Sequence, residues 1–175
     1  MRFAYADPPY LGMAKRYAGQ HPDALLWDDP ETHRALIERL CSDYDGWAMS
    51  LHLPSFRVLL PMCPPDVRLM AWCKSWASWK PGVVPAYAWE PVIMRPAKRK
   101  RRWKNGMMTT PSDWLVTPAA QTDFFGAKPP QFTWWVLACL GVQRDDDFTD
   151  LFPGSGAVGR AWEAWRAQLP LGAVG

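Results

Sequence analysis

The chain has 175 residues and a mass of 19.9 kDa, which predicts one domain (residues 1–175) with a buried core. Its formal net charge of +3 is only a weak indication of an anionic partner. Four scattered cysteines without a CxxC pair, and no apolar run of signal-peptide or membrane-spanning length, predict reduced thiols, no metal site, no membrane partner and a cytoplasmic location.

The first predicted element is a short buried strand over residues 1–6, followed directly by DPPY. Pro8 and Pro9 end this strand because a proline cannot donate to a ladder. Asp7 and Tyr10 therefore fall at the carboxyl end of a strand, which is where ligands bind in open α/β sheets. Taken alone, the tetrapeptide is explained about equally well by a turn that caps the strand.

The middle of the chain alternates predicted helices and strands. A polar, broken loop precedes a helix that has Asp29 as N-cap and Pro30 at its first position. The next predicted elements are a strand over 46–53, a short helix over 54–62, and strands over 66–74 and 86–95. Pro91 in the last of these indicates a bulge or an edge position. The alternation predicts a layered α/β fold rather than a helix bundle.

From residue 95 to residue 128 the chain loses its periodicity, and the first ten residues carry seven Lys or Arg and no acid. Loops of this length in compact domains are usually functional or disordered. The basic run suits phosphate contacts, and its tryptophan can stack on a base, although an isolated run is more often a solvated charge cluster. The candidate nucleic-acid-binding residues are Lys98, Arg99, Lys100, Arg101, Arg102, Trp103 and Lys104.

A helix is predicted over 129–141, where we assign Trp134 and Trp135 to the core, and a strand, a glycine turn and an amphipathic helix follow over 146–169. Gly154, Gly156 and Gly159 allow a tight turn, close ligand approach and close packing of the next helix. Such a turn can hold a nucleotide-like ligand, although similar turns also exist for packing alone. No acid follows Glu163, which argues against a dinucleotide-binding enzyme.

The two motifs together suggest a chemistry. If a flat, amino-bearing base lies against Tyr10, the carboxylate of Asp7 and the backbone carbonyl of Pro8 can accept its amino hydrogens. The nitrogen lone pair then points toward an electrophile, and the prolines hold these acceptors in place.

DPPY followed far downstream by DLFPGSG resembles the S-adenosylmethionine (SAM)-dependent DNA amino-methyltransferases, which methylate adenine N6 or cytosine N4. The motif order is similar to their permuted, beta-type arrangement, and GAKPPQF (residues 126–132) resembles their Lys-Pro element. The resemblance covers nearly the whole chain and is closest to small methyltransferase-like proteins of actinobacteria and their phages. It implies a Rossmann-like α/β methyltransferase fold, with a mainly parallel sheet, helices on both faces, and truncation at one edge.

The resemblance also implies roles for individual residues. The catalytic tetrad would be Asp7, Pro8, Pro9 and Tyr10. The residues that bind SAM would be Asp7, Lys128, Asp150, Phe152, Gly154, Ser155 and Gly156. Larger members hold the cofactor ribose with an acid on a further strand, so here Asp123 takes that role, or binding is weak, or a partner subunit completes the site.

The predicted activity is methylation of adenine N6 in DNA, because tetrads of cytosine enzymes more often begin with Ser. Segment 95–128 is the candidate target-recognition insert. Two alternatives stay open: a non-catalytic module that binds nucleic acid or a protein partner on a degraded methyltransferase fold, and an RNA adenine methyltransferase. An exposed sheet edge would also suit a homodimer.

Overall fold

A computed structural model describes residues 1–19, 23–79, 81–98, 110–119 and 126–168. Its centre is a six-stranded sheet in the order β5-β3-β4-β2-β1-β6. The strands are β1 (Arg2–Ala6), β2 (Gly46–Ser50), β3 (Arg68–Ser78), β4 (Tyr87–Arg95), β5 (Trp114–Val116) and β6 (Asp147–Asp150). The α-helices are α1 (Pro30–Asp43), α2 (Leu53–Leu59), α3 (Pro130–Leu140) and α4 (Ala157–Gln168). Three short 3-10 helices are η1 (Ala14–Tyr17), η2 (Ala24–Asp28) and η3 (Leu60–Met62).

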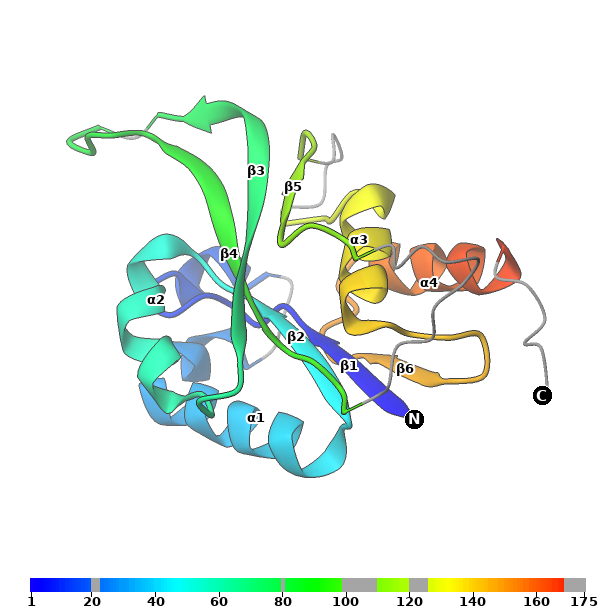
Figure 1. Cartoon of the computed structure of the whole chain (residues 1–175). Helices are drawn as coiled ribbons and strands as arrows, with labels where there is room; N and C mark the ends of the chain where they lie inside the picture. Colours follow the sequence, from blue (N-terminus) through cyan, green and yellow to red (C-terminus); the bar gives the residue numbers. More distant parts are fainter. Residues whose placement is uncertain (20–22, 80, 99–109, 120–125, 169–175) are drawn as a thin grey trace.

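The sheet is the middle of three layers, with α1 and α2 on one face and α3 and α4 on the other (Figure 1). Strand β1 shows why, since its side chains alternate between two hydrophobic clusters. Phe3 and Tyr5 join the cluster of α3 and α4, whereas Ala4 and Ala6 join that of α1 and α2. The predicted α/β fold with helices on both faces is thereby confirmed.

Local signals in the sequence set the helix ends. The Asp29 carboxylate accepts a hydrogen bond from the backbone N–H of Glu31 at 3.0 Å, and Pro30 is the first residue of α1. Helix α3 ends at Gly141, whose φ of 74° is the left-handed conformation that favours glycine. Both predicted helix ends are confirmed.

The tryptophans of α3 lie in the core, as predicted. Trp135 is buried, and its Nε1 donates to the Ser112 carbonyl at 2.8 Å. Trp134 packs against the same cluster, and its Nε1 donates to the Ala161 carbonyl in α4 at 3.0 Å. These bonds satisfy the polar atoms of the two indoles and tie α3 to its neighbours.

The expectation of a bulge or an edge at Pro91 is wrong. Strand β4 lies between β3 and β2, and the register shift of the β3–β4 pair falls between Cys73 and Ser78. Pro91 pairs with Ala71 in regular register. Its carbonyl accepts from Leu51 N at 3.3 Å, just past the last β2–β4 ladder pair, so the missing N–H falls where that ladder ends.

The sheet is mixed. Strand β1 pairs in parallel with β2 and β6, and β3 with β5, whereas β4 is antiparallel to both neighbours. The loop before α1 contains η1 and η2, and segment 95–128 contains the unpredicted β5. Strand β5 has three residues and forms by pairing with β3, so no local sequence pattern predicts it. In the described part of the chain, no helix has the length and apolar character needed to cross a membrane.

Candidate functional site

The two motifs meet at the carboxyl ends of neighbouring strands. Strands β1 and β6 are parallel, and Tyr5 pairs with Asp150 near their ends. From there the first chain continues into Asp7–Tyr10 and the second into the glycine turn. Although the motifs lie far apart in sequence, the sheet therefore places them side by side.

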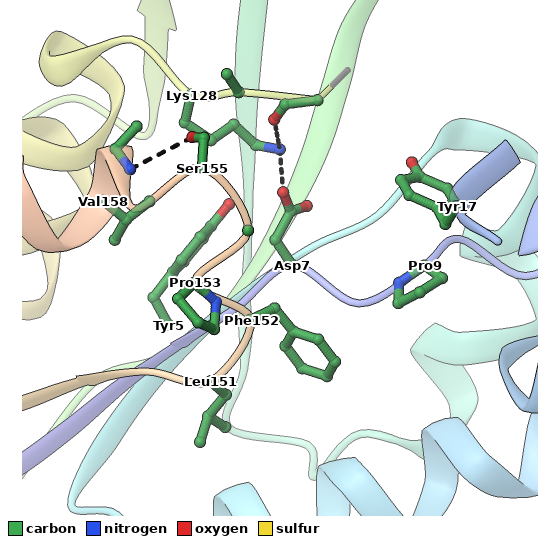
Figure 2. Close-up of a pocket in the computed structure, with 14 residues that line it drawn as sticks. Tyr5, Asp7, Pro9, Tyr17, Lys128, Leu151, Phe152, Pro153, Ser155 and Val158 are labelled. Carbon is green, nitrogen blue, oxygen red and sulfur yellow. Dashed lines mark hydrogen bonds and ion pairs between the residues drawn. The ribbon is translucent and has the colours of Figure 1, made fainter. Parts of the chain in front are cut away.

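A cavity of about 420 Å³ opens between the two strand ends. Figure 2 shows the Lys128 side chain reaching toward Asp7, with the turn that carries Ser155 beside them. Of the ten residues predicted to act in catalysis or SAM binding, six line this cavity: Asp7, Pro9, Lys128, Phe152, Gly154 and Ser155. The other four do not line it: Pro8, Tyr10, Asp150 and Gly156.

Asp7 is the charged centre of the arrangement. Its Oδ2 accepts a hydrogen bond from the buried Lys128 ammonium, which is 121 positions away and also donates to the Gly126 carbonyl at 3.2 Å. Its Oδ1 accepts from the Tyr10 hydroxyl at 3.2 Å. Burial raises the pKa of Asp7 above its ordinary value, while the charge and hydrogen bond of Lys128 act to lower it. The pair holds a carboxylate in a largely desolvated place.

Tyr10 faces a second, smaller cavity of about 170 Å³. Its ring is stacked on His52 with centroids 5.4 Å apart and an interplanar angle of 8°. Its hydroxyl lies 3.5 Å from Glu90 Oε2, and Glu90 is ion-paired with Lys74. Because a hydroxyl has one proton, Tyr10 can donate to Asp7 or to Glu90 but not to both at once. Burial also raises the pKa of Tyr10 well above its ordinary value, so the hydroxyl keeps its proton.

The glycine turn has the conformations that its sequence predicts. Gly154 and Gly156 have φ values of 44° and 72°, and the Gly156 N–H donates to the Pro153 carbonyl at 2.6 Å. The Ser155 hydroxyl accepts from the first N–H of α4 at 3.4 Å. The expectation that Gly159 allows close packing of the next helix is wrong, because a Cβ there would meet nothing within 4 Å.

Asp150 ends β6 close to this cavity. Its Oδ1 accepts from Phe152 N at 3.2 Å, whereas its Oδ2 is buried without a hydrogen-bond partner among the described residues. Burial raises the pKa of Asp150 to about 6; the Phe152 bond opposes this shift and the charge of Asp7 adds to it. A buried unpaired carboxylate oxygen is costly and is the kind of atom that a bound ligand can satisfy.

Sequence reasoning missed several residues of the site. Tyr5 and Tyr17 line the large cavity, and Lys74 and Glu90 line the small one. A signal existed for Tyr5, which alternates with Ala4 and Ala6 in the strand that leads to DPPY. Tyr17 comes from η1 in a segment that lacked a regular pattern, and the Lys74–Glu90 pair depends on the β3–β4 pairing.

Part of the predicted nucleic-acid-binding set is described. Lys98 is exposed, whereas Arg99 to Lys104 lie outside the described residues, as does Asp123. Within the described ranges, no His, Cys, Asp and Glu side chains gather in a group that could hold a metal ion.

Comparisons with known proteins concern the fold. No family model and no curated protein matches the sequence. The crystal structure of M1.HpyAVI in complex with SAM matches with a TM-score of 0.52 and 16% identity, over 93% of this chain and 78% of that one. A second crystal structure of M1.HpyAVI gives 0.50 and 16%, over 94% and 76%. The fold of this chain is therefore the Rossmann-like α/β fold that M1.HpyAVI has.

Proposed function

We propose that this chain is a SAM-dependent methyltransferase that modifies an exocyclic amino group of a nucleic-acid base, with adenine N6 in DNA as the favoured target. One observation carries the proposal. The DPPY segment after β1 and the glycine turn after β6 lie at adjacent strand ends, and both contribute residues to the cavity of about 420 Å³. The likeness of the fold to M1.HpyAVI, whose structure is a SAM complex, supports the same reading.

The residues of the cavity fit such a cofactor. Its volume lies within the range of about 300–1,000 Å³ that is usual for small-molecule sites. Phe152 offers an aromatic face, and Lys128 and Asp7 offer opposite charges to the carboxylate and amino groups of the methionine part. Asp7 is the only acid among the described residues that line the cavity.

The chain's own groups would orient the target amine. When bound, the cofactor supplies an electrophilic sulfonium methyl group. Asp7 and the Pro8 carbonyl accept the two amino hydrogens, which directs the nitrogen lone pair at that methyl group. Tyr10 presents a face to the base and, through its hydroxyl, holds one oxygen of Asp7 in position. Preorganised acceptors of this kind contribute without reorganisation when the reaction occurs.

Adenine in DNA is favoured over the alternatives by the Asp at the first tetrad position. An RNA methyltransferase would use the same groups. The exposed Lys98 and the basic run that follows it are proposed to contact phosphates, and segment 95–128 is proposed to carry target recognition.

The test is transfer of label from radiolabelled SAM to single-stranded DNA, duplex DNA and RNA, each offered with adenine or with cytosine as its only methyl acceptor. Wild type should label an adenine polymer, and Asp7→Ala should lose at least about 100-fold of the rate. Asp145→Ala, at an exposed acid outside the site, is the matched control and should keep full activity. SAM binding without any methyl transfer would favour the non-catalytic module. Label that appears only in RNA would change the proposed substrate from DNA to RNA.

A further inference from the structure

Strands β3 and β4 run together well past the rest of the sheet and form a projecting arm (Figure 1). We define this arm as residues 75–79 and 81–87. Both of its tryptophans face solvent, since Trp76 is 58% and Trp79 is 84% exposed. Val84, near the tip, is 94% exposed. The arm thus presents large apolar side chains that the described core does not cover.

These exposed indoles are not a continuation of the core. Trp72, four residues before Trp76 in the same strand, is 2% exposed, and its Nε1 donates to the Thr117 carbonyl at 3.2 Å. Exposed apolar groups that cluster on one element mark interaction surfaces more often than chance. Tryptophan in particular offers a wide, flat face on which a planar ligand can stack.

The root of the arm leads into the candidate site. Lys74, Tyr87, Trp89 and Glu90 all line the small cavity, and Tyr10 lines it from the segment after β1. The cavity of about 170 Å³ is smaller than the roughly 300 Å³ at which pockets for drug-sized ligands begin, which suits one flat ring system better than a whole nucleotide. Arg16 adds a positive charge to its lining. The small cavity, which Tyr10 also lines, therefore lies at the root of the arm that carries the exposed indoles.

We propose that the arm binds single-stranded nucleic acid, with unpaired bases stacked on Trp76 and Trp79, and guides one base into the small cavity beside Tyr10. This inference rests on the proposed function and deepens it, because it assigns unpaired strands as the substrate class. Bases expose both faces only when they are unstacked and unpaired, and stacking on aromatic side chains tolerates any sequence. A strand that is already open also avoids the cost of extracting a base from a duplex.

The experiment measures fluorescence anisotropy of a labelled oligo(dT), which has no exocyclic amine and so reports binding without methyl transfer. An abasic oligonucleotide of equal length keeps the phosphates and removes the bases. Oligo(U) and a duplex of equal length complete the set. Wild type should bind oligo(dT) more tightly than the abasic strand and than the duplex.

The Trp76→Ala/Trp79→Ala double variant should bind oligo(dT) at least about tenfold more weakly, since loss of stacking costs roughly 5- to 150-fold per base. Its affinity for the abasic strand should not change. Trp76→Phe/Trp79→Phe should restore most of the affinity because a ring is retained. Trp114→Ala in β5 removes an indole that is 56% exposed and lies outside the arm, so it is the matched control and should bind like wild type.

Equal binding of oligo(dT) by wild type and the double alanine variant overturns the inference, as does tighter binding of duplex than of single strands. A double variant that turns from dimer to monomer with unchanged oligonucleotide affinity overturns it as well and makes the arm a self-association surface. The SAM-induced shift in melting temperature, measured on the same proteins, separates the two proposals. If SAM does not raise the melting temperature of the wild-type protein, the proposed function is rejected whatever the oligonucleotide data show.

Discussion

Lys128 decides the charge state of Asp7, because it is the only cation that the described structure hydrogen-bonds to that carboxylate. In Lys128→Met the burial of Asp7 remains but its opposing charge is lost, so the pKa of Asp7 should rise further. Methyl transfer needs the carboxylate form in the proposed mechanism. The acidic limb of the kcat/KM profile should therefore move to higher pH by about 1–3 units.

Lys128→Arg keeps the positive charge and should return that limb toward its wild-type position. A carbon NMR titration of the Asp7 carboxyl gives the same answer without an activity assay. If Lys128→Met and Lys128→Arg titrate alike, Lys128 does not set the pKa of Asp7.

Asp150 should make the protein less stable as pH rises, which is the opposite of the usual effect of an acid whose pKa is lowered on folding. Its folded pKa is raised from 3.8 to about 6, so the native state binds more protons than the unfolded state between these values. Stability should therefore fall as pH rises from about 4 to about 6 and stay level above that. Asp150→Asn keeps an oxygen for the Phe152 N–H and removes the buried charge. At neutral pH the variant should be more stable by on the order of 2 kcal/mol, measured by urea unfolding at several pH values. A constant difference across the range would contradict this account.

At the scale of elements, Gly156 in the turn between β6 and α4 and Gly159 inside α4 have different roles. Gly156 has a φ of 72°, and a Cβ there would lie 3.0 Å from Arg160 Nη1. Gly156→Ala should cost about 1–2 kcal/mol of unfolding free energy, since an alanine is strained in this conformation. Gly159 lies inside α4 with open space around it, so Gly159→Ala should stabilise by about 0.5–1 kcal/mol. Denaturant unfolding checks both, and equal effects would show that the turn imposes no special conformation.

The same contrast explains which elements the sequence could predict. The start of α1 and the end of α3 could be predicted because their signals act on the adjacent backbone. These signals are Asp29 and Pro30 for α1 and Gly141 for α3. The position of Pro91 and the existence of β5 depend on which strands pair, and that is decided by contacts far along the chain. The glycine spacing predicted the tight turn, but it also predicted close packing at Gly159, which depends on where neighbouring elements lie.

For the molecule as a whole, the order of strands in the sheet brings DPPY and the glycine turn together in one candidate site. The sequence could predict a site at DPPY and at the glycine turn because each is a local pattern. The order of the two motifs along the chain, which resembles that of a known family, suggested that they act together. The partners of these residues could not be predicted. Lys128 reaches Asp7 over 121 positions, and Glu90 reaches Tyr10 over 80. Such pairs exist only once β1, β4 and the loop before α3 have been brought together.

A ligand that binds between β1 and β6 should stabilise the whole fold, because it ties the strand ends of the central sheet together and cannot bind the unfolded chain. At a concentration 100 times its dissociation constant, SAM should add about 2.7 kcal/mol. For a chain of this size that corresponds to a rise in Tm of roughly 5–10 °C. Asp7→Ala and Gly156→Ala should reduce the shift, whereas the Trp76→Ala/Trp79→Ala variant should keep it, since the arm lies outside the large cavity. ATP serves as the control for a nucleotide without a methionine part. Equal shifts with SAM and ATP would mean that the cavity does not recognise the methionine part, and no shift with either would remove the cofactor from this site.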